Sequence, residues 1–240
     1  MIVKIMDKDA IFDDVAKRYV NFINSKPKCV LGLATGSTPV GLYQRLVRLN
    51  KEGKVTFKDV TTYNLDEYVG LDGAHDQSYR YFMNDNLFNH IDINKDNTHV
   101  LKGTGDYLKY MKGYDKLIKK DGGIDIQLLG IGSDGHIAFN EPGTSFRSLT
   151  HIATLAESTI EDNARFFKSK DEVPTKAVTM GLKSIMNARE IILIATGANK
   201  ANAIKALLSG KVDKNWPCTI LQKHKNCTIY CDREAYNAEK

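Results

Sequence analysis

The chain has 240 residues, and its 34 Lys and Arg against 29 Asp and Glu give a formal net charge of +5 at pH 7. Its apolar fraction of 42% is enough to build a sizeable core, while no apolar run approaches the roughly 20 residues of a membrane span. Because the basic residues are spread out without forming a stripe, we expect no nucleic-acid or membrane partner, and a charge that suits a small anionic substrate.

The N-terminus and the cysteines indicate the cytoplasm. The first nine residues contain no apolar signal region followed by a small-residue cleavage site. The four cysteines, Cys29, Cys218, Cys227 and Cys231, suit reduced thiols. Since a zinc or redox site at Cys227 and Cys231 would need a second ligand pair, we expect structural cysteines.

Helices and strands alternate along the chain. Apolar residues recur at helical spacing over residues 8–24, and Pro27 ends that helix. The other predicted helices are residues 39–49, 78–88, 107–119, 182–186 and 200–208. The predicted strands are residues 29–34, 60–65, 126–131, 177–179, 191–196, 219–221 and 228–231. This order predicts an α/β fold, a Rossmann-like three-layer single domain over residues 1–240, with a mostly parallel central sheet and helices on both faces.

Residues 150–173 differ from the rest of the chain. They are polar and show little apolar periodicity except near Phe166 and Phe167. From composition alone, this segment is either a plain surface excursion or a mobile lid over a site.

Two loops between a predicted strand and a predicted helix suit an anion. In the first, Gly36 permits a tight turn, Thr38 can cap the helix and Pro39 suits its first position. The hydroxyls of Thr35 and Ser37 and the free amides there can hold a phosphate, although a well-capped helix start is the simpler alternative. In the second loop, Lys200 begins a helix, where a cation opposes the helix dipole; it either neutralises an anion or is a surface lysine.

Adjacent acids follow the predicted strand 60–65. Read without other information, Asp66 and Glu67 are solvated loop residues. If they continue the strand, alternation points them to opposite sides, so that only one faces a shared cleft.

Residues 132–142 concentrate the most chemistry, directly after the apolar strand 126–131. Asp134, His136 and Glu141 combine an imidazole, which titrates near neutral pH, with two carboxylates that can fix its tautomer. This set predicts a proton-transfer site. All three are also metal-ligand types, but no second histidine or cysteine cluster is near in sequence, and a loop held by side-chain hydrogen bonds is the remaining alternative.

Four segments together resemble the glucosamine-6-phosphate deaminase family (glucosamine/galactosamine-6-phosphate isomerases). They are Gly32–Pro39, Asn64–Leu71, Gly132–Pro142 and the region Arg165–Phe167, in matching order and spacing over about residues 1–235. The resemblance implies conversion of glucosamine 6-phosphate to fructose 6-phosphate and ammonia in amino-sugar catabolism, without metal or organic cofactor. The sugar phosphate is the expected partner, and we assign the enzyme to the hydrolases.

The resemblance also implies residue roles. His136 is similar to the acid/base that opens the sugar ring, and Asp134 and Glu141 to its carboxylate partners. Asp66 resembles the base that takes the proton from carbon 2. The expected phosphate contacts are Thr35, Gly36, Ser37, Arg165 and Lys200.

The chain departs from allosteric members of the family. Where those carry an Arg and Lys pair for N-acetylglucosamine 6-phosphate, this chain has His151 and Ala153. It also ends at Lys240, short of their C-terminal extension. We therefore expect a non-allosteric enzyme, and favour a monomer over a homo-oligomer.

Two other functions are weighed. A 6-phosphogluconolactonase needs a base to activate water but none at carbon 2, so Asp66 would be idle. A sugar-phosphate-sensing effector domain would need a helix-turn-helix, for which there is no room before the strand at Cys29.

Overall fold

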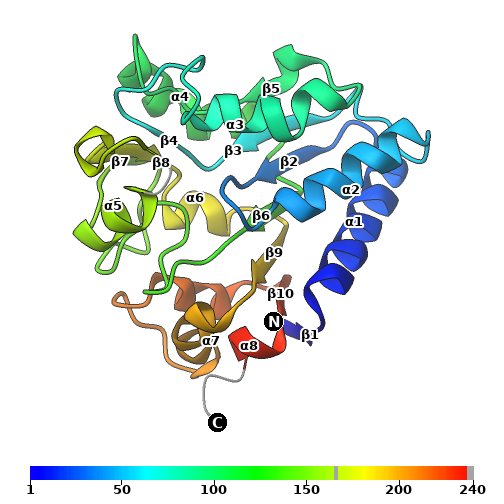
Figure 1. Cartoon of the computed structure of the whole chain (residues 1–240). Coiled ribbons are helices and arrows are strands. Elements are labelled where there is room, and N and C mark those ends of the chain that lie inside the picture. The colour runs from blue at the N-terminus through cyan, green and yellow to red at the C-terminus, as the bar shows by residue number, and fades with distance from the viewer. Residues whose placement is uncertain (165–166, 237–240) are drawn as a thin grey trace.

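A computed structural model describes residues 1–164 and 167–236. Seven strands form the central sheet, and every neighbouring pair in it is parallel (Figure 1). In spatial order the strands are β1 (Ile2–Ile5), β10 (Cys227–Cys231), β9 (Glu190–Ala195), β6 (Ile126–Leu129), β2 (Val30–Leu33), β3 (Thr61–Asn64) and β5 (Thr98–His99). All residues of β2, β6 and β9 are buried, as expected where helices cover both faces of a parallel sheet. The predicted α/β fold is confirmed.

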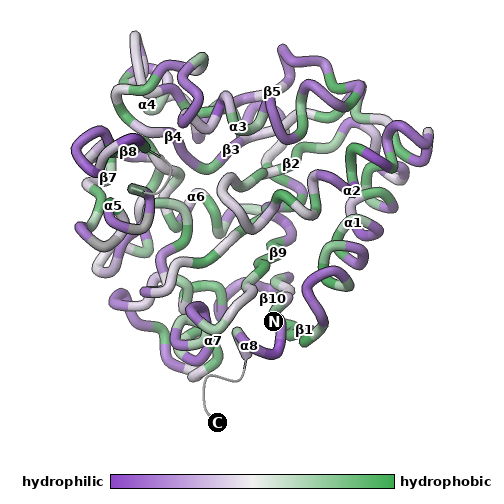
Figure 2. Tube along the Cα trace, in the orientation of Figure 1, coloured by the Kyte–Doolittle hydropathy of each residue, from purple (hydrophilic) through white to green (hydrophobic). Residues whose placement is uncertain are grey.

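The α-helices of the described residues include the six predicted ones and two that the sequence analysis missed, over residues 157–164 and 233–236. They are α1 (Lys8–Ser25), α2 (Val40–Lys51), α3 (Tyr79–Asn86), α4 (Tyr107–Lys120), α5 (Glu157–Ala164), α6 (Leu182–Met186), α7 (Ala201–Leu208) and α8 (Arg233–Tyr236). Short 3-10 helices are η1 (Phe88–His90), η2 (Lys95–Asn97), η3 (Lys170–Glu172), η4 (Ala198–Lys200) and η5 (Pro217–Lys223). In α1 the apolar side chains at helical spacing are buried, and Figure 2 shows its alternating apolar and polar sides.

A second, antiparallel sheet lies beside the carboxyl edge of the first. Its order is β4 (Asp66–Tyr68), β8 (Lys176–Thr179) and β7 (His151–Thr154). The strand predicted at 177–179 therefore belongs to this sheet rather than to the parallel one. A small apolar cluster, here called the second core, packs against it and consists of Tyr68, Phe139, Ala153, Leu155 and Ala177.

One predicted strand is wrong, and one of the two alternatives for residues 150–173 is excluded. Residues 219–221 form part of the 3-10 helix η5 instead of a strand, because the Thr219 hydroxyl donates to the backbone oxygens of Asp213 and Trp216 and closes a local turn. Residues 150–173 are no plain excursion, since they contain β7 and α5 and contribute Ala153 and Leu155 to the second core. That they move as a lid stays a prediction.

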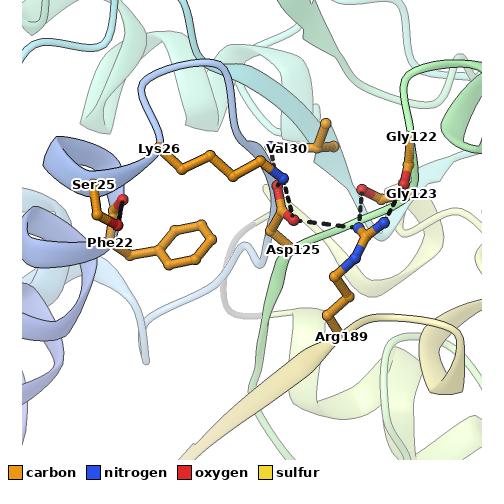
Figure 3. Close-up of polar contacts among 8 residues, drawn as sticks. All are labelled: Phe22, Ser25, Lys26, Val30, Gly122, Gly123, Asp125 and Arg189. Atoms are coloured by element: carbon orange, nitrogen blue, oxygen red, sulfur yellow. Dashed lines mark hydrogen bonds and ion pairs between the residues drawn. The ribbon is translucent and has the colours of Figure 1, made fainter.

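A buried carboxylate ties together the amino ends of three central strands. Asp125, directly before β6, accepts hydrogen bonds from the Val30 amide (2.9 Å), from Lys26 Nζ (2.7 and 2.9 Å) and from Arg189 (3.2 Å) (Figure 3). Arg189 also donates to the carbonyl oxygens of Gly122 and Gly123 after α4. This end of the sheet is thus closed by polar contacts, and the opposite, carboxyl end carries the loops in which α/β folds place their ligands.

Candidate active site

A cavity of about 480 Å³ opens at the carboxyl end of β2, β3 and β6. Its wall includes six of the residues that the sequence predicts as functional: Thr35, Gly36, Ser37, Asp66, His136 and Lys200. Asp134 and Glu141 lie behind His136, in contact with its imidazole. Segments that are distant in sequence therefore meet at one cavity, as predicted. Arg165 lies outside the described residues.

One end of the cavity is suited to an anion. Gly36 has φ +89°, a left-handed conformation that favours glycine, and turns the chain between β2 and α2. The helix begins at Val40, and no side chain of the described residues caps it, so the predicted capping role of Thr38 is wrong. The amides of the first turn of a helix lack intrahelical partners, and here they lie beside the hydroxyls of Thr35, Ser37 and Thr38.

Lys200 adds a cation to the same cavity. It lies at the end of η4, directly before α7, and its backbone amide donates to the Gly197 oxygen (3.1 Å). The Gly197 amide in turn donates to both carboxylate oxygens of Asp232 (3.1 and 2.9 Å), which fixes the turn. A rigid turn thus places an ammonium group near a second helix start, an arrangement that favours bound negative charge.

The imidazole of His136 lies against Gly132. A Cβ atom at Gly132 would come within 2.3 Å of the imidazole, so only glycine fits there. Asp134 Oδ1 accepts the His136 backbone amide (3.1 Å) and lies 2.8 Å from Nδ1, although not aligned as in an ideal hydrogen bond. With a carboxylate beside Nδ1, the proton is favoured on that nitrogen, and Nε2 becomes the nitrogen that exchanges protons.

His136 also holds Asp134 in its ionised form. Burial by itself would raise the pKa of Asp134, but the hydrogen bond and charge of His136 outweigh that effect and lower the pKa below its ordinary value. The pair therefore keeps a carboxylate beside the imidazole at neutral pH.

Glu141 is the second carboxylate near Nδ1 of His136. Its Oε1 accepts hydrogen bonds from the Ala156 amide (3.2 Å) and the Thr159 hydroxyl (2.8 Å). Its Oε2 is buried 3.8 Å from His136 Nδ1 and has no hydrogen-bond partner among the described residues. One ligand atom from each of Asp134, His136 and Glu141 lies within 4.8 Å of the others, close enough to hold a metal ion. That the site uses none stays a prediction.

Asp66 is a buried carboxyl group facing the cavity. It is 6% exposed, lines the wall and accepts no side-chain hydrogen bond from the residues described. Burial, and then the charge of Glu67, raise the pKa of Asp66 to about 8. A base with a pKa near neutrality suits proton abstraction from carbon.

Glu67 points to the other side of β4. Its Oε1 accepts the amides of Tyr68 and Tyr79 (both 2.9 Å) and its Oε2 that of Arg80 (3.0 Å), so it caps α3. Burial raises the pKa of Glu67 to about 7, while these amides act in the opposite direction. The expected alternation of the two acids is confirmed, whereas the interpretation as solvated loop residues is wrong because both belong to a buried strand.

Some residues of the cavity wall escape the sequence analysis. Tyr68, Tyr79 and Phe139 form an aromatic cluster with ring centroids 4.9 to 6.1 Å apart, and Thr159 and Asn163 of α5 complete the wall. Their side chains carry no chemistry that distinguishes them from core or surface residues in a linear sequence.

Comparison with known proteins places the chain in a family. The sequence profile described as glucosamine-6-phosphate isomerases/6-phosphogluconolactonase matches residues 7–230. The chain belongs to this family. The resemblance inferred from the four motifs is thereby confirmed.

Individual relatives of the family share most of the chain. A glucosamine-6-phosphate deaminase from Mycoplasma mycoides is 50% identical over 234 residues, covering 98% of this chain and 95% of the relative. A solved monomeric glucosamine-6-phosphate deaminase matches with a TM-score of 0.97 at 42% identity over 100% of both chains. A 6-phosphogluconolactonase from Thermotoga maritima has a TM-score of 0.76 at 20% identity over 96% of this chain and 98% of that one, which shows the fold alone.

The comparisons correct one expectation. The assignment to the hydrolases is wrong, because the relatives that match at 42–50% identity are deaminases in an isomerase family.

Within the described residues, no helix is long and apolar enough to cross a membrane.

Proposed function

We propose that the chain converts D-glucosamine 6-phosphate to D-fructose 6-phosphate and ammonia, by an aldose-ketose isomerisation coupled to deamination. One observation carries this function: a carboxyl base, Asp66, shares a cavity with an imidazole that has its own carboxylate partners. An anion-binding end, at the start of α2 and Lys200, lies in the same cavity. The names of the relatives agree with this chemistry.

The phosphate anchors the substrate. The amides at the start of α2, the hydroxyls of Thr35 and Ser37 and the ammonium group of Lys200 would bind it, with Arg165 as a further expected contact. Because the phosphate lies away from the bonds that change, its binding energy can be used to position the sugar.

Ring opening is the first chemical step. A cyclic sugar has no acidic proton at carbon 2, so a proton must first move from the anomeric hydroxyl to the ring oxygen. His136 is suited to both transfers, and Asp134 and Glu141 stabilise the imidazolium that forms between them.

Proton transfer between carbons follows. The substrate enters this step as an open-chain aldehyde with an ammonium group at carbon 2. Asp66 takes the proton from carbon 2 while one ammonium proton moves to the oxygen at carbon 1, which gives an enolamine. Return of the first proton from Asp66 to carbon 1 then leaves an iminium group at carbon 2. Water supplies the new carbonyl oxygen as ammonia leaves, so that the atoms balance. Side chains of the protein and this water carry all the proposed steps.

A 6-phosphogluconolactonase activity is the second candidate, and the structure favours it less. Lactone opening requires one base and water, so a second, buried base with a raised pKa would have no task. The solved lactonase from Thermotoga maritima is 20% identical to this chain, so its likeness supports the fold and not the activity.

The finer properties are proposals as well. A monomer is supported by the monomeric relative of known structure. The lack of an allosteric sugar-phosphate site is supported by Ala153, whose side chain is buried in the second core. A cytoplasmic location is supported by the four buried, unpaired cysteines.

The direct test is to incubate the purified protein with glucosamine 6-phosphate and to measure ammonia and fructose 6-phosphate. We expect equal amounts of both, hyperbolic kinetics, and no activation by N-acetylglucosamine 6-phosphate. Hydrolysis of 6-phosphogluconolactone without ammonia release from the amino sugar would favour the second candidate.

A further inference from the structure

Glu141 is held in place by a distant segment. The donors to its side chain are the amide of Ala156 and the hydroxyl of Thr159, which follow it by 15 and 18 residues and flank the start of α5. The carboxylate position thus depends on where the first turn of α5 lies as well as on the loop that carries Glu141.

That turn is itself well anchored. The Leu155 amide donates to the Thr175 oxygen (2.9 Å), and Leu155 lies in the second core. Ile160 packs against the same core from within α5. Thr159, 5% exposed, therefore presents its hydroxyl to Glu141 from a fixed position.

The geometry around His136 shows what this contact controls. Asp134 lies 2.8 Å from Nδ1, whereas Glu141 Oε2 lies 3.8 Å from the same nitrogen and has no hydrogen-bond partner among the described residues. A shift of about 1 Å separates Glu141 from hydrogen-bond distance. Because Thr159 holds the other oxygen, its position decides how closely the second carboxylate approaches the imidazole.

We propose that Thr159 is a positioning residue of the proposed deaminase, whose hydroxyl holds Glu141 against His136 and so makes α5 part of the proton relay. The expected effect on turnover rests on the proposed function, whereas the effect on the position of Glu141 does not. Thr159 also lines the cavity, so a sugar phosphate bound there lies beside the turn that orients the relay.

The test compares Thr159→Val, which keeps the shape and loses the hydroxyl, with Thr159→Ser, which keeps the hydroxyl. We expect Thr159→Val to lower kcat about 10- to 100-fold, as for loss of a hydrogen bond to a charged group, with KM changed by less than about threefold. Thr159→Ser should retain kcat within about threefold. Thr154→Val, the same change at an exposed position of β7, is the matched control and should behave like the wild type.

Two further results separate positioning from packing. In a Glu141→Gln background, Thr159→Val should cost less than about threefold, because its effect acts through the carboxylate. An equal loss in both backgrounds, full activity of Thr159→Val, or failure of Thr159→Ser would overturn the inference.

Crystal structures make the test independent of activity. The Glu141 side chain should turn away from its position in Thr159→Val and keep it in Thr159→Ser. An unmoved Glu141 in Thr159→Val contradicts the inference even if the wild type proves inactive. A wild type that releases no ammonia contradicts the proposed function alone.

Discussion

Asp66 shows how a single residue can serve chemistry at the expense of stability. It is buried and hydrogen-bonded to no side chain of the described residues, and its pKa is raised from 3.8 to about 8. The folded state therefore keeps a proton that the unfolded chain loses near pH 4. As far as Asp66 is concerned, the free energy of unfolding is therefore highest below about pH 4 and falls as the pH rises towards 8.

Asp66→Asn should separate stability from activity. Asparagine stays neutral at every pH, so the variant should gain stability relative to wild type between pH 4 and 8, on the order of a few kcal/mol at neutrality. Turnover should fall at least roughly 10³-fold for want of a base, while an inert sugar phosphate still binds. Thermal unfolding, ammonia release and calorimetry measure the three effects. Near-normal turnover would remove Asp66 from the base role.

The pH profile should report the same carboxyl group. Since Asp66 must be ionised to act, kcat/KM should rise about tenfold per unit on the acid side and level off near pH 8. Glu67→Gln removes the charge that helps to raise the pKa of Asp66, so the acid limb should move to lower pH. Titrations of the substrate are common to both proteins and cancel in the comparison. An unshifted limb would show that another group governs the profile.

Much of the site is predictable at this scale, and some of it is not. Asp66, Asp134, His136 and Glu141 carry ionisable groups in short, specific motifs. The structure brings Asp66 and His136 to one cavity, with Asp134 and Glu141 against the imidazole. Thr159 could not be found in this way, because it follows Glu141 by 18 residues and their contact depends on the path of the chain between them.

At the scale of elements, short loops after strands carry the chemistry. The turn between β6 and Ile137 is closed by backbone bonds from Gly132 to His136 and from Gly135 to Gly132. Ala138, with φ 52°, is the single non-glycine residue in a left-handed conformation within the described chain. Backbone strain next to a cavity is common where a loop must hold functional groups.

Comparing Gly132→Ala with Gly36→Ala tests whether the loop after β6 serves turnover and the loop before α2 serves substrate binding. In Gly132→Ala the added Cβ would collide with the imidazole, so the variant should lose turnover by at least about 100-fold. Gly36→Ala meets no atom within 4 Å and should cost about 1 kcal/mol of stability from its left-handed backbone, with its main effect on KM. Steady-state kinetics of both variants measure these effects on kcat and KM. The same kinetic defect in both variants would contradict the assignment of turnover to the first loop and of substrate binding to the second.

The errors in secondary structure have physical causes. The run at 219–221 has β-forming residues, but the Thr219 hydroxyl and Pro217 favour a tight helical turn. Strand β7 and helix α5 lack a clear apolar period because only a few of their side chains reach the second core. Such tertiary contacts are not visible in the local pattern.

At the scale of the whole molecule, the amino ends of the central strands carry stabilising polar contacts and the carboxyl ends carry the cavity. Asp125, with a side chain 2% exposed, joins three elements at the amino edge, while the cavity lies at the carboxyl edge. The alternation of helices and strands predicts this parallel sheet, and parallel strands put all their carboxyl ends on one side.

Asp125→Ala should therefore affect folding and not chemistry. It leaves the Val30 amide and the Lys26 side chain without their acceptor and removes one of the acceptors of Arg189. The free energy of unfolding should fall by about 2–4 kcal/mol. Below the melting transition, kcat and KM should match wild type. Denaturant unfolding and kinetics are the measurements, and a kinetic defect without loss of stability would show that the two edges are coupled.

The most direct test of the central claim is a crystal structure with an inert open-chain analogue, 2-amino-2-deoxyglucitol 6-phosphate. The account predicts the phosphate at the start of α2 beside Lys200, the Asp66 carboxylate over carbons 1 and 2, and the His136 imidazole near the oxygen that closes the ring. A phosphate bound elsewhere, or Asp66 and His136 both turned away from the sugar, would contradict it.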